Sequence, residues 1–276
     1  MKKVLLAGIF FALSPFCGAQ NMIKSNPYSS KERIFIYWGY NRGQFSKTDI
    51  HFKGQEYNFT LKSVIAKDRP TPLSTLYINP TQITIPQYNF RIGYFINPKY
   101  SISFGFDHMK YVMEQDQTVT INGKIGASDS EYDRTYNNEP IKLSGNFLRF
   151  EHTNGLNYLN LELRRMDNIL SRENLKIRHI DLNIFTGVGA GILYPKTDVS
   201  LLSFEENDQW HLAGYGLDVV GGLNLTFFKH FFIQAEVKGG YINMPDILTT
   251  NFPNDRASQH FFFLQENLNI GFVVKF

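Results

Sequence analysis

The segment FLQENLNIGFVVKF (263–276) decides the fold, because its side chains alternate between two chemical kinds. One face of the extended chain carries apolar side chains: Leu264, Leu268, Ile270, Phe272, Val274 and Phe276. The other face carries polar or small residues: Gln265, Asn267, Asn269, Gly271 and Lys275. A period of two residues is typical of a β-strand that separates two environments.

Seven further segments repeat this alternation: 34–41, 87–96, 100–111, 156–165, 179–192, 213–227 and 231–241. Their polar faces combine Gly, Ser and Asn with a few charges of both signs. A soluble sandwich would instead show a solvent face rich in Lys, Glu and Thr. Small polar side chains fit the narrow interior of a small barrel whose apolar face meets lipid. The sequence therefore predicts an all-β fold, an up-and-down antiparallel transmembrane β-barrel of eight strands.

The connections between these segments alternate between short and long. Tight turns are expected at 96–99 and 227–230, and a somewhat longer turn at 164–174. The long polar connections are 44–86, 114–146, 193–211 and 244–259. Short turns face the periplasm and long loops face the exterior in bacterial barrels, so we expect long extracellular loops.

Residues 48–67 alternate too, which predicts a hairpin above the membrane within the extracellular loop 44–86. If this hairpin entered the wall, the barrel would have ten strands. Eight strands are favoured because charged side chains of the hairpin would lie badly in lipid: Asp49, Lys53, Lys62 and Lys67.

The first residues predict export. MKK is a basic start, VLLAGIFFAL is a short apolar core, and CGA ends in small residues, so a signal peptide is expected at 1–19, with the barrel domain at 20–276. A lipid anchor on Cys17 is the alternative, disfavoured by the bulky Phe16 before it. Removal of 1–19 takes away the single cysteine and lowers the formal charge from +3 to +1. So small a charge argues against nucleic acid binding.

The signal junction after Ala19, the eight amphipathic segments and the terminal Phe276 resemble outer-membrane β-barrel proteins of Gram-negative bacteria. The stretch WGYNRGQFSKTDIHFKGQEYNFTL (38–61) is similar to uncharacterised barrels of Bacteroidota. The resemblance implies insertion in the outer membrane after export across the inner membrane. It also implies contact with outer-membrane lipids, lipopolysaccharide and the barrel-assembly machinery, and it implies no activity.

Eight charged residues are expected to point into the barrel: Arg91, Asp107, Glu162, Arg164, Asp181, Asp218, Glu236 and Lys238. They could line a selective path or supply an acid/base pair. A buried ionic network is the favoured interpretation, because an eight-stranded interior is narrow and buried charges need partners of opposite sign. A wide pore is therefore not expected, and a narrow transport barrel stays as an alternative function.

No cofactor or metal site is expected. The seven histidines are scattered, and no cysteine accompanies them in the mature chain. The loop residues Asp129, Glu131 and Asp133 lack the glycine and closing glutamate of an EF-hand, so we interpret them as a solvated acidic loop.

RFEHTNG (149–155) resembles the His-containing strand of lipid A deacylases. That resemblance implies an esterase in which His152 activates a hydroxyl, here that of Thr153, while Glu151 orients the ring. The match is incomplete, because the second residue after His152 is Asn154 rather than serine. Thr153 reaches the ring only if a bulge forms at 153–155.

The alternative role for His152 is contact with lipid headgroups. Leu148 and Phe150 are expected to face lipid, and His152 with them. Together with His108 and Lys110 it would then bind lipopolysaccharide phosphates at the interface. The sequence thus favours a non-enzymatic barrel with a structural or surface-interaction role through its extracellular loops. The alternatives are a lipid A esterase and a narrow transporter.

Overall fold

The computed structural model describes residues 33–275, except for 73, 127, 171–178, 203, 205, 206 and 208. The predicted signal peptide and Phe276 lie outside the described residues. Within them, one short 3-10 helix, η1 (Thr75–Tyr77), accompanies fourteen strands. No helix in this part of the chain is long and apolar enough to span a membrane.

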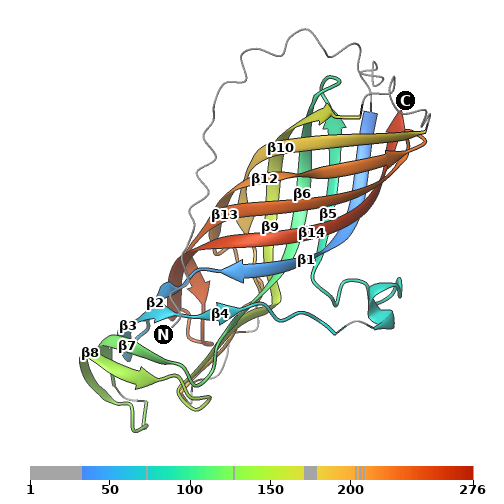
Figure 1. Ribbon diagram of the computed structural model, residues 1–276. Helices are drawn as coiled ribbons and strands as arrows, with labels where there is room; N and C mark the ends of the chain where they lie inside the picture. The colour runs from blue at the N-terminus through green and yellow to red at the C-terminus, as the bar shows by residue number, and fades with distance from the viewer. Residues whose placement is uncertain are drawn as a thin grey trace, which may run out of the picture.

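Eight long strands form the wall of a barrel (Figure 1). In spatial order they are β1 (Arg33–Phe45), β5 (Tyr88–Phe95), β6 (Tyr100–Met113), β9 (Leu148–Asn168), β10 (Ile180–Leu193), β12 (Gly214–Phe227), β13 (Phe231–Leu248) and β14 (Arg256–Lys275). Neighbours pair antiparallel, and the whole length of β1 also pairs with residues 263–275 of β14, which closes the ring. The predicted count of eight wall strands is confirmed.

An apolar belt covers the outside of this ring. Its exposed side chains are mainly aliphatic or aromatic, as in Phe104, Leu161, Val188, Val219 and Ile270. The residues that alternate with them point inward, are buried and are mostly polar or small. In a closed ring every strand pairs with two neighbours, so this wall can lie in lipid without unpaired sheet edges. The fold is an up-and-down transmembrane β-barrel.

Short connections lie at the end of the barrel that carries the C-terminus, at the top of Figure 1. Residues 96–99 join β5 to β6, and residues 228–230 join β12 to β13. The third predicted turn, 164–174, begins later than expected, because β9 continues to Asn168. Residues 171–174 of that turn lie outside the described residues. The longer connections extend from the opposite end, and much of their length is folded.

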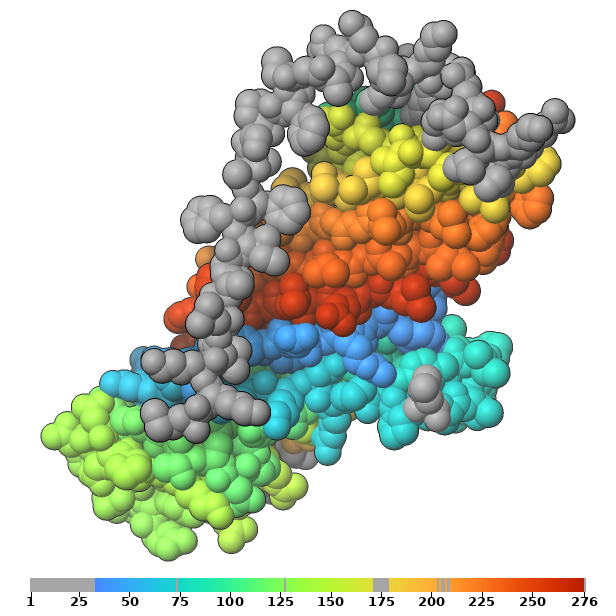
Figure 2. Space-filling model, in the orientation of Figure 1, coloured from blue at the N-terminus to red at the C-terminus, as the bar shows by residue number. Residues whose placement is uncertain are grey.

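Four strands continue the sheet beyond the belt, and we call them the platform: β2 (Thr48–Lys53), β3 (Tyr57–Val64), β7 (Thr118–Ile125) and β8 (Arg134–Lys142). β2 pairs with 256–259 of β14, and β3, β7 and β8 follow in that order. The platform projects from the barrel, with β7 and β8 in the green lobe of Figure 2. The predicted 48–67 hairpin corresponds to β2 and β3, which stand outside the wall.

Two short strands complete the part of the protein beyond the belt. β4 (Ala66–Lys67) pairs with the end of β6, and β11 (Asp198–Leu201) pairs with the end of β9. The ends of β6 and β9 therefore gain additional strand partners beyond the belt.

The inward face of the wall strands changes its chemistry where they leave the belt. On β6 the inward side chains within the belt are polar, Ser101, Ser103 and Asp107. Farther along the same face they are apolar, Met109, Tyr111 and Met113. The strand keeps its facing, but its surroundings change from lipid to water, so the hydrophobic effect now drives apolar groups inward.

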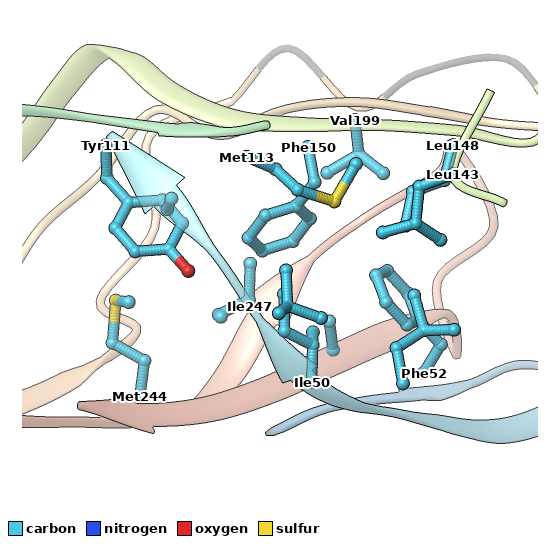
Figure 3. Packing of buried hydrophobic residues seen from close by; sticks show 14 of the residues in the cluster. Ile50, Phe52, Tyr111, Met113, Leu143, Leu148, Phe150, Val199, Met244 and Ile247 are labelled. Carbon is cyan, nitrogen blue, oxygen red and sulfur yellow. The ribbon is translucent and has the colours of Figure 1, made fainter. Parts of the chain in front are cut away.

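These apolar side chains form one large core with the platform (Figure 3). Figure 3 shows Ile50 and Phe52 of β2 close to Phe150 of β9 and Met113 of β6. The rings of Phe52 and Phe150 meet edge to face, with centroids 5.7 Å apart. A second, smaller apolar cluster closes the other end of the barrel, formed by Phe35, Tyr37, Phe95, Phe232 and Val273. The polar side chains that point inward within the belt lie between these two clusters, and we call them the polar layer.

Candidate functional site

The polar layer contains all eight charged residues that the sequence analysis placed inside the barrel. None is more than 5% exposed: Arg91, Asp107, Glu162, Arg164, Asp181, Asp218, Glu236 and Lys238. All of these except Asp181 and Asp218 belong to one chain of ion pairs. The alternation of the strands brings these charges into the interior.

Glu162, on β9, is the centre of this network. Its Oε1 accepts a hydrogen bond from Arg91 Nη2 at 2.5 Å and lies 2.9 Å from Lys238 Nζ. Its Oε2 accepts from Arg164 Nε at 2.5 Å. One carboxylate therefore pairs with three cations that come from three other positions on the ring wall.

The same cations reach further partners. Arg164 Nη1 donates to Glu236 Oε2 at 3.0 Å, and Lys238 Nζ donates to Asp107 Oδ2 at 2.5 Å. The Tyr37 hydroxyl accepts from Arg91 Nε at 3.0 Å and from Arg164 Nη2 at 3.1 Å. Tyr37 is a further member of the network that was not predicted from the sequence. It shares the inward face of β1 with Gly39 and Asn41, which is the signal that could have identified it.

The two remaining carboxylates are Asp181 on β10 and Asp218 on β12. Asp218 accepts a hydrogen bond from the Tyr158 hydroxyl at 2.7 Å. Asp181 is buried on the inward face of β10. Asp218 and Tyr158 are both buried, as side chains of a packed interior are.

A small cavity borders the polar layer. A cavity of about 30 Å³ lies toward the C-terminal end, lined by residues that include Arg33, Ser101 and Arg164. That volume corresponds to roughly one water molecule. Packed apolar clusters lie on both sides of the layer, and they close the interior around it.

His152 is completely buried in the large apolar core, not exposed to lipid. Its Nε2 lies 3.0 Å from the Gln259 amide nitrogen, and its Nδ1 lies 2.9 Å from Thr197 Oγ1. Because an amide nitrogen only donates, Nε2 accepts, and the neutral ring carries its proton on Nδ1. Burial lowers the pKa of His152 to about 3, so the ring stays neutral at physiological pH. Local sequence does not predict either polar partner, because both come from distant segments.

The prediction that Leu148, Phe150 and His152 face lipid is wrong. All three are buried, and they lie on the same inward face as Tyr158 and Asn160 farther along β9. The prediction assumed that apolar side chains always mark the lipid side. This stretch lies beyond the belt, where apolar side chains point inward.

The predicted catalytic group does not assemble. Thr153 Oγ1 donates to Glu151 Oε1 at 2.9 Å, so these two residues contact each other on the outer side of the strand. A bulge is present at this place, since β9 has two extra residues between the pairs Tyr111 with His152 and Met109 with Leu156. It does not turn Thr153 toward the imidazole. The hydroxyl beside the ring belongs to the buried Thr197 instead.

His108 and Lys110 point outward on β6, where His108 is buried and Lys110 is half-buried. The His108 ring stacks on Tyr88, with centroids 5.1 Å apart, and its Nδ1 is hydrogen-bonded to Asn157 at 2.8 Å. Lys110 Nζ donates to the carbonyl of Ile85 at 3.0 Å. His152 lies on the opposite face of the wall, so the three residues do not form one headgroup site. Among the described residues, no group of three or more His, Cys, Asp or Glu side chains is placed to hold a metal ion.

No protein-family model matches the chain, and no curated protein is significantly similar to it. Among solved structures, the chain is similar to the outer membrane protein OprG from Pseudomonas aeruginosa, with 10% identity, a TM-score of 0.40 and coverage of 91% of this chain and 100% of that chain. It is also similar to Neisserial surface protein A, with 9% identity, a TM-score of 0.33 and coverage of 88% and 97%. These weak likenesses carry no functional argument.

The ring itself defines the class of the protein, which is an eight-stranded transmembrane β-barrel with a polar, packed interior. Its distinguishing part is the platform and the apolar core beneath it. The resemblances to Bacteroidota barrels and to lipid A deacylases remain predictions.

Proposed function

We propose that the chain is an outer-membrane barrel with a non-enzymatic role in surface interaction, carried by the platform on the extracellular side. One observation supports this role above the others. The long connections form a paired sheet with its own apolar core, so they present a defined surface. Ordering so many loop residues costs roughly 1–2 kcal/mol each in backbone entropy, which burial of the core offsets.

The proposed orientation places the platform outside the cell and the short turns in the periplasm. The single cysteine, Cys17, falls in the predicted signal peptide, so introduced cysteines would be unique labels in the mature chain. Lys124 on β7 and Lys229 in the turn between β12 and β13 are both exposed and lie at opposite ends of the molecule. They form a matched pair for labelling.

In intact Gram-negative cells, Lys124→Cys is expected to react with a membrane-impermeant maleimide. Lys229→Cys is expected to react only after the outer membrane has been permeabilised. The reverse pattern, or equal labelling of both variants in intact cells, would contradict the orientation. Recovery of the protein in the inner-membrane fraction would contradict the location.

Neither alternative function gains support from the described side chains. For an esterase, His152 would need access to lipid and an accessible nucleophile, but it is buried against Thr197. Mass spectrometry of lipid A from cells with and without the gene tests this directly. We expect the same acyl pattern in both, and loss of an acyl chain only in the presence of the gene would overturn the non-enzymatic role.

A narrow transport path would have to pass through the ion pairs around Glu162. The network and the two apolar clusters occupy the interior along its length. We therefore expect no discrete conductance in planar-bilayer recordings, at protein amounts for which insertion has been verified. Reproducible single-channel steps would favour transport instead.

A further inference from the structure

A groove of about 340 Å³ opens on the outer side of the wall beyond the apolar belt. It crosses β6, β9 and β11, and Arg69 borders it from the chain that follows β4. Its lining consists of Arg69, Val112, Met113, Gln115, Arg149, Phe150, Glu151, Asp198 and Ser200. Pockets for small ligands start at a volume of roughly 300 Å³, so the groove has room for one monosaccharide-sized group.

The strand register sets the order of the polar groups in this groove. Glu151 of β9 lies between Val112 of β6 and Asp198 of β11. Arg149, two residues earlier on β9, lies opposite Ser200. The central strand therefore contributes one cation and one carboxylate, and β11 contributes a second carboxylate and a hydroxyl.

Glu151 has its partners within the protein. It accepts a hydrogen bond from Arg69 Nη1 at 2.9 Å and another from Thr153 Oγ1 at 2.9 Å. These two contacts use both carboxylate oxygens and hold Arg69 at the border of the groove. Glu151 is thus a structural member of the lining.

Arg149 and Asp198 differ from Glu151 in this respect. In the described part of the chain, neither the Arg149 guanidinium nor the Asp198 carboxylate has a side-chain hydrogen bond or an ion pair. Diagonal neighbours on paired strands are about 7–8 Å apart, so the two groups are separate anchors. Asp198 also lies directly opposite Glu151, and such a like-charge pair favours a ligand that donates hydrogen bonds to it.

The charges of the lining restrict the chemistry of the ligand. Two guanidinium groups and two carboxylates balance each other, which disfavours a polyanion, and a lining of mainly polar groups disfavours an acyl chain. A sugar acid satisfies both free anchors. Its carboxylate would pair with Arg149 through two parallel hydrogen bonds, and its hydroxyls would donate to Asp198 and Ser200. The C–H face of the ring would lie on Val112.

The position of the groove fits such a ligand. Along the outward face of β6, Phe104 lies in the apolar belt, His108 and Lys110 follow, and Val112 lies in the groove. The groove therefore opens sideways in the layer just above the lipid. We propose that it binds a sugar-acid residue of a surface glycan, either lipid-linked or soluble.

Binding to the purified, detergent-solubilised barrel can be measured by saturation-transfer NMR and calorimetry, with glucuronate, glucose and acetate as probes. Glucuronate is expected to bind at least tenfold more tightly than glucose or acetate. Arg149→Gln is expected to reduce its affinity to that of glucose, and Asp198→Asn is expected to weaken it at least tenfold. Lys124→Gln, an exposed substitution outside the groove, is the matched control and should bind as the wild type does.

Equal binding of all three probes, or wild-type affinity in both groove variants, would overturn the proposal. Every variant should first show the same heat-dependent gel shift as the wild type, so that a misfolded barrel is recognised. Displacement of glucuronate by oligosaccharide released from outer-membrane lipid would identify a lipid-linked glycan. Displacement only by a soluble acidic glycan would identify the other source. The placement of this groove on the cell surface rests on the proposed function. Binding of glucuronate by the purified protein is tested independently of that placement.

Discussion

At the scale of single residues, two tyrosines of the apolar core differ in how their hydroxyls are satisfied. The Tyr111 hydroxyl is completely buried and has no hydrogen-bond partner among the described residues. The Tyr57 hydroxyl donates to Asp255 Oδ2 at 2.9 Å and lies 3.4 Å from Thr249 Oγ1. Burial raises the pKa of both, so both are protonated at neutral pH.

These two residues provide a matched pair of substitutions. Tyr111→Phe is expected to stabilise the protein by about 1 kcal/mol, because it removes a buried polar group that lacks a partner. Tyr57→Phe is expected to destabilise it by about 1–3 kcal/mol, because Asp255 then loses a donor. Urea unfolding measured in the same detergent checks both. A loss of stability in Tyr111→Phe would contradict the unsatisfied hydroxyl.

His152 predicts a dependence of stability on pH. Its pKa is about 3 in the folded protein, and an unfolded histidine has a pKa of about 6.5. As the pH falls below about 6.5, the unfolded chain binds a proton that the folded chain does not, so the free energy of unfolding decreases. The loss is about 1.4 kcal/mol per pH unit and ends near pH 3, where the folded protein also binds the proton.

This effect is measured against His152→Gln, which keeps a polar, neutral side chain at this place. Between pH 7 and pH 4 the wild type should lose more stability than the variant in urea titrations. Other groups titrate in both proteins alike, so the difference between the two curves isolates the histidine. Parallel curves would contradict a buried, neutral His152.

At the scale of elements, the platform depends on its apolar face more than on its strand pairing. Phe52 and Phe59 are stacked, with centroids 5.1 Å apart, and both are buried in the core. β2 attaches to β14 through only four paired residues, 256–259. The packing of this face therefore holds the platform against the barrel.

Phe59→Ala is expected to loosen the platform without opening the ring. Truncation of a buried phenylalanine costs about 3–5 kcal/mol, and this loss falls on the platform strands. Limited proteolysis should cut within 114–146 faster than in the wild type, while the unboiled protein should keep its gel mobility. The control is Thr60→Ala on the solvent side of β3, which should leave proteolysis unchanged. Loss of the gel shift in Phe59→Ala would show that the ring depends on the platform.

At the scale of the whole molecule, the ion pairs join β5, β6, β9 and β13 across the interior of the ring. Removal of one charge leaves its partners buried and unpaired, which typically costs about 3–5 kcal/mol. Lys238→Met leaves Asp107 and Glu162 without this cation. Its effect should therefore reach the ring itself.

The wild type is expected to run faster unboiled than boiled on a gel, because the ring resists the detergent. Lys238→Met should lose this shift at a lower temperature than the wild type. Lys99→Met is the control, because Lys99 pairs with Asp167 at 2.9 Å but is about one-third exposed. Exposed ion pairs contribute about 0–1 kcal/mol, so its shift should be close to that of the wild type. Equal transitions in all three proteins would contradict the network as a stabilising element.

The sequence by itself determined the barrel, its strand count and the identity of the inward-facing residues in the belt. Alternation with a period of two specifies which side chains share a face, and lipid outside a narrow polar interior makes the two faces distinguishable. That rule alone predicts which charged residues point into the barrel, from Arg91 on β5 to Lys238 on β13. Their pairwise contacts do not follow from it, since Arg91 and Lys238 reach Glu162 from β5 and β13, which only the closed ring brings close to β9.

Tertiary structure alone decided whether the side chains around His152 point outward or inward. The same alternation continues past the belt, but water replaces lipid outside, so apolar side chains change from the outward to the inward face. The sequence pattern does not mark the height at which this change occurs. It depends on where the platform packs against the wall strands and where β11 pairs with β9. That packing buries His152, and the pairing places Arg149 and Asp198 in an external groove.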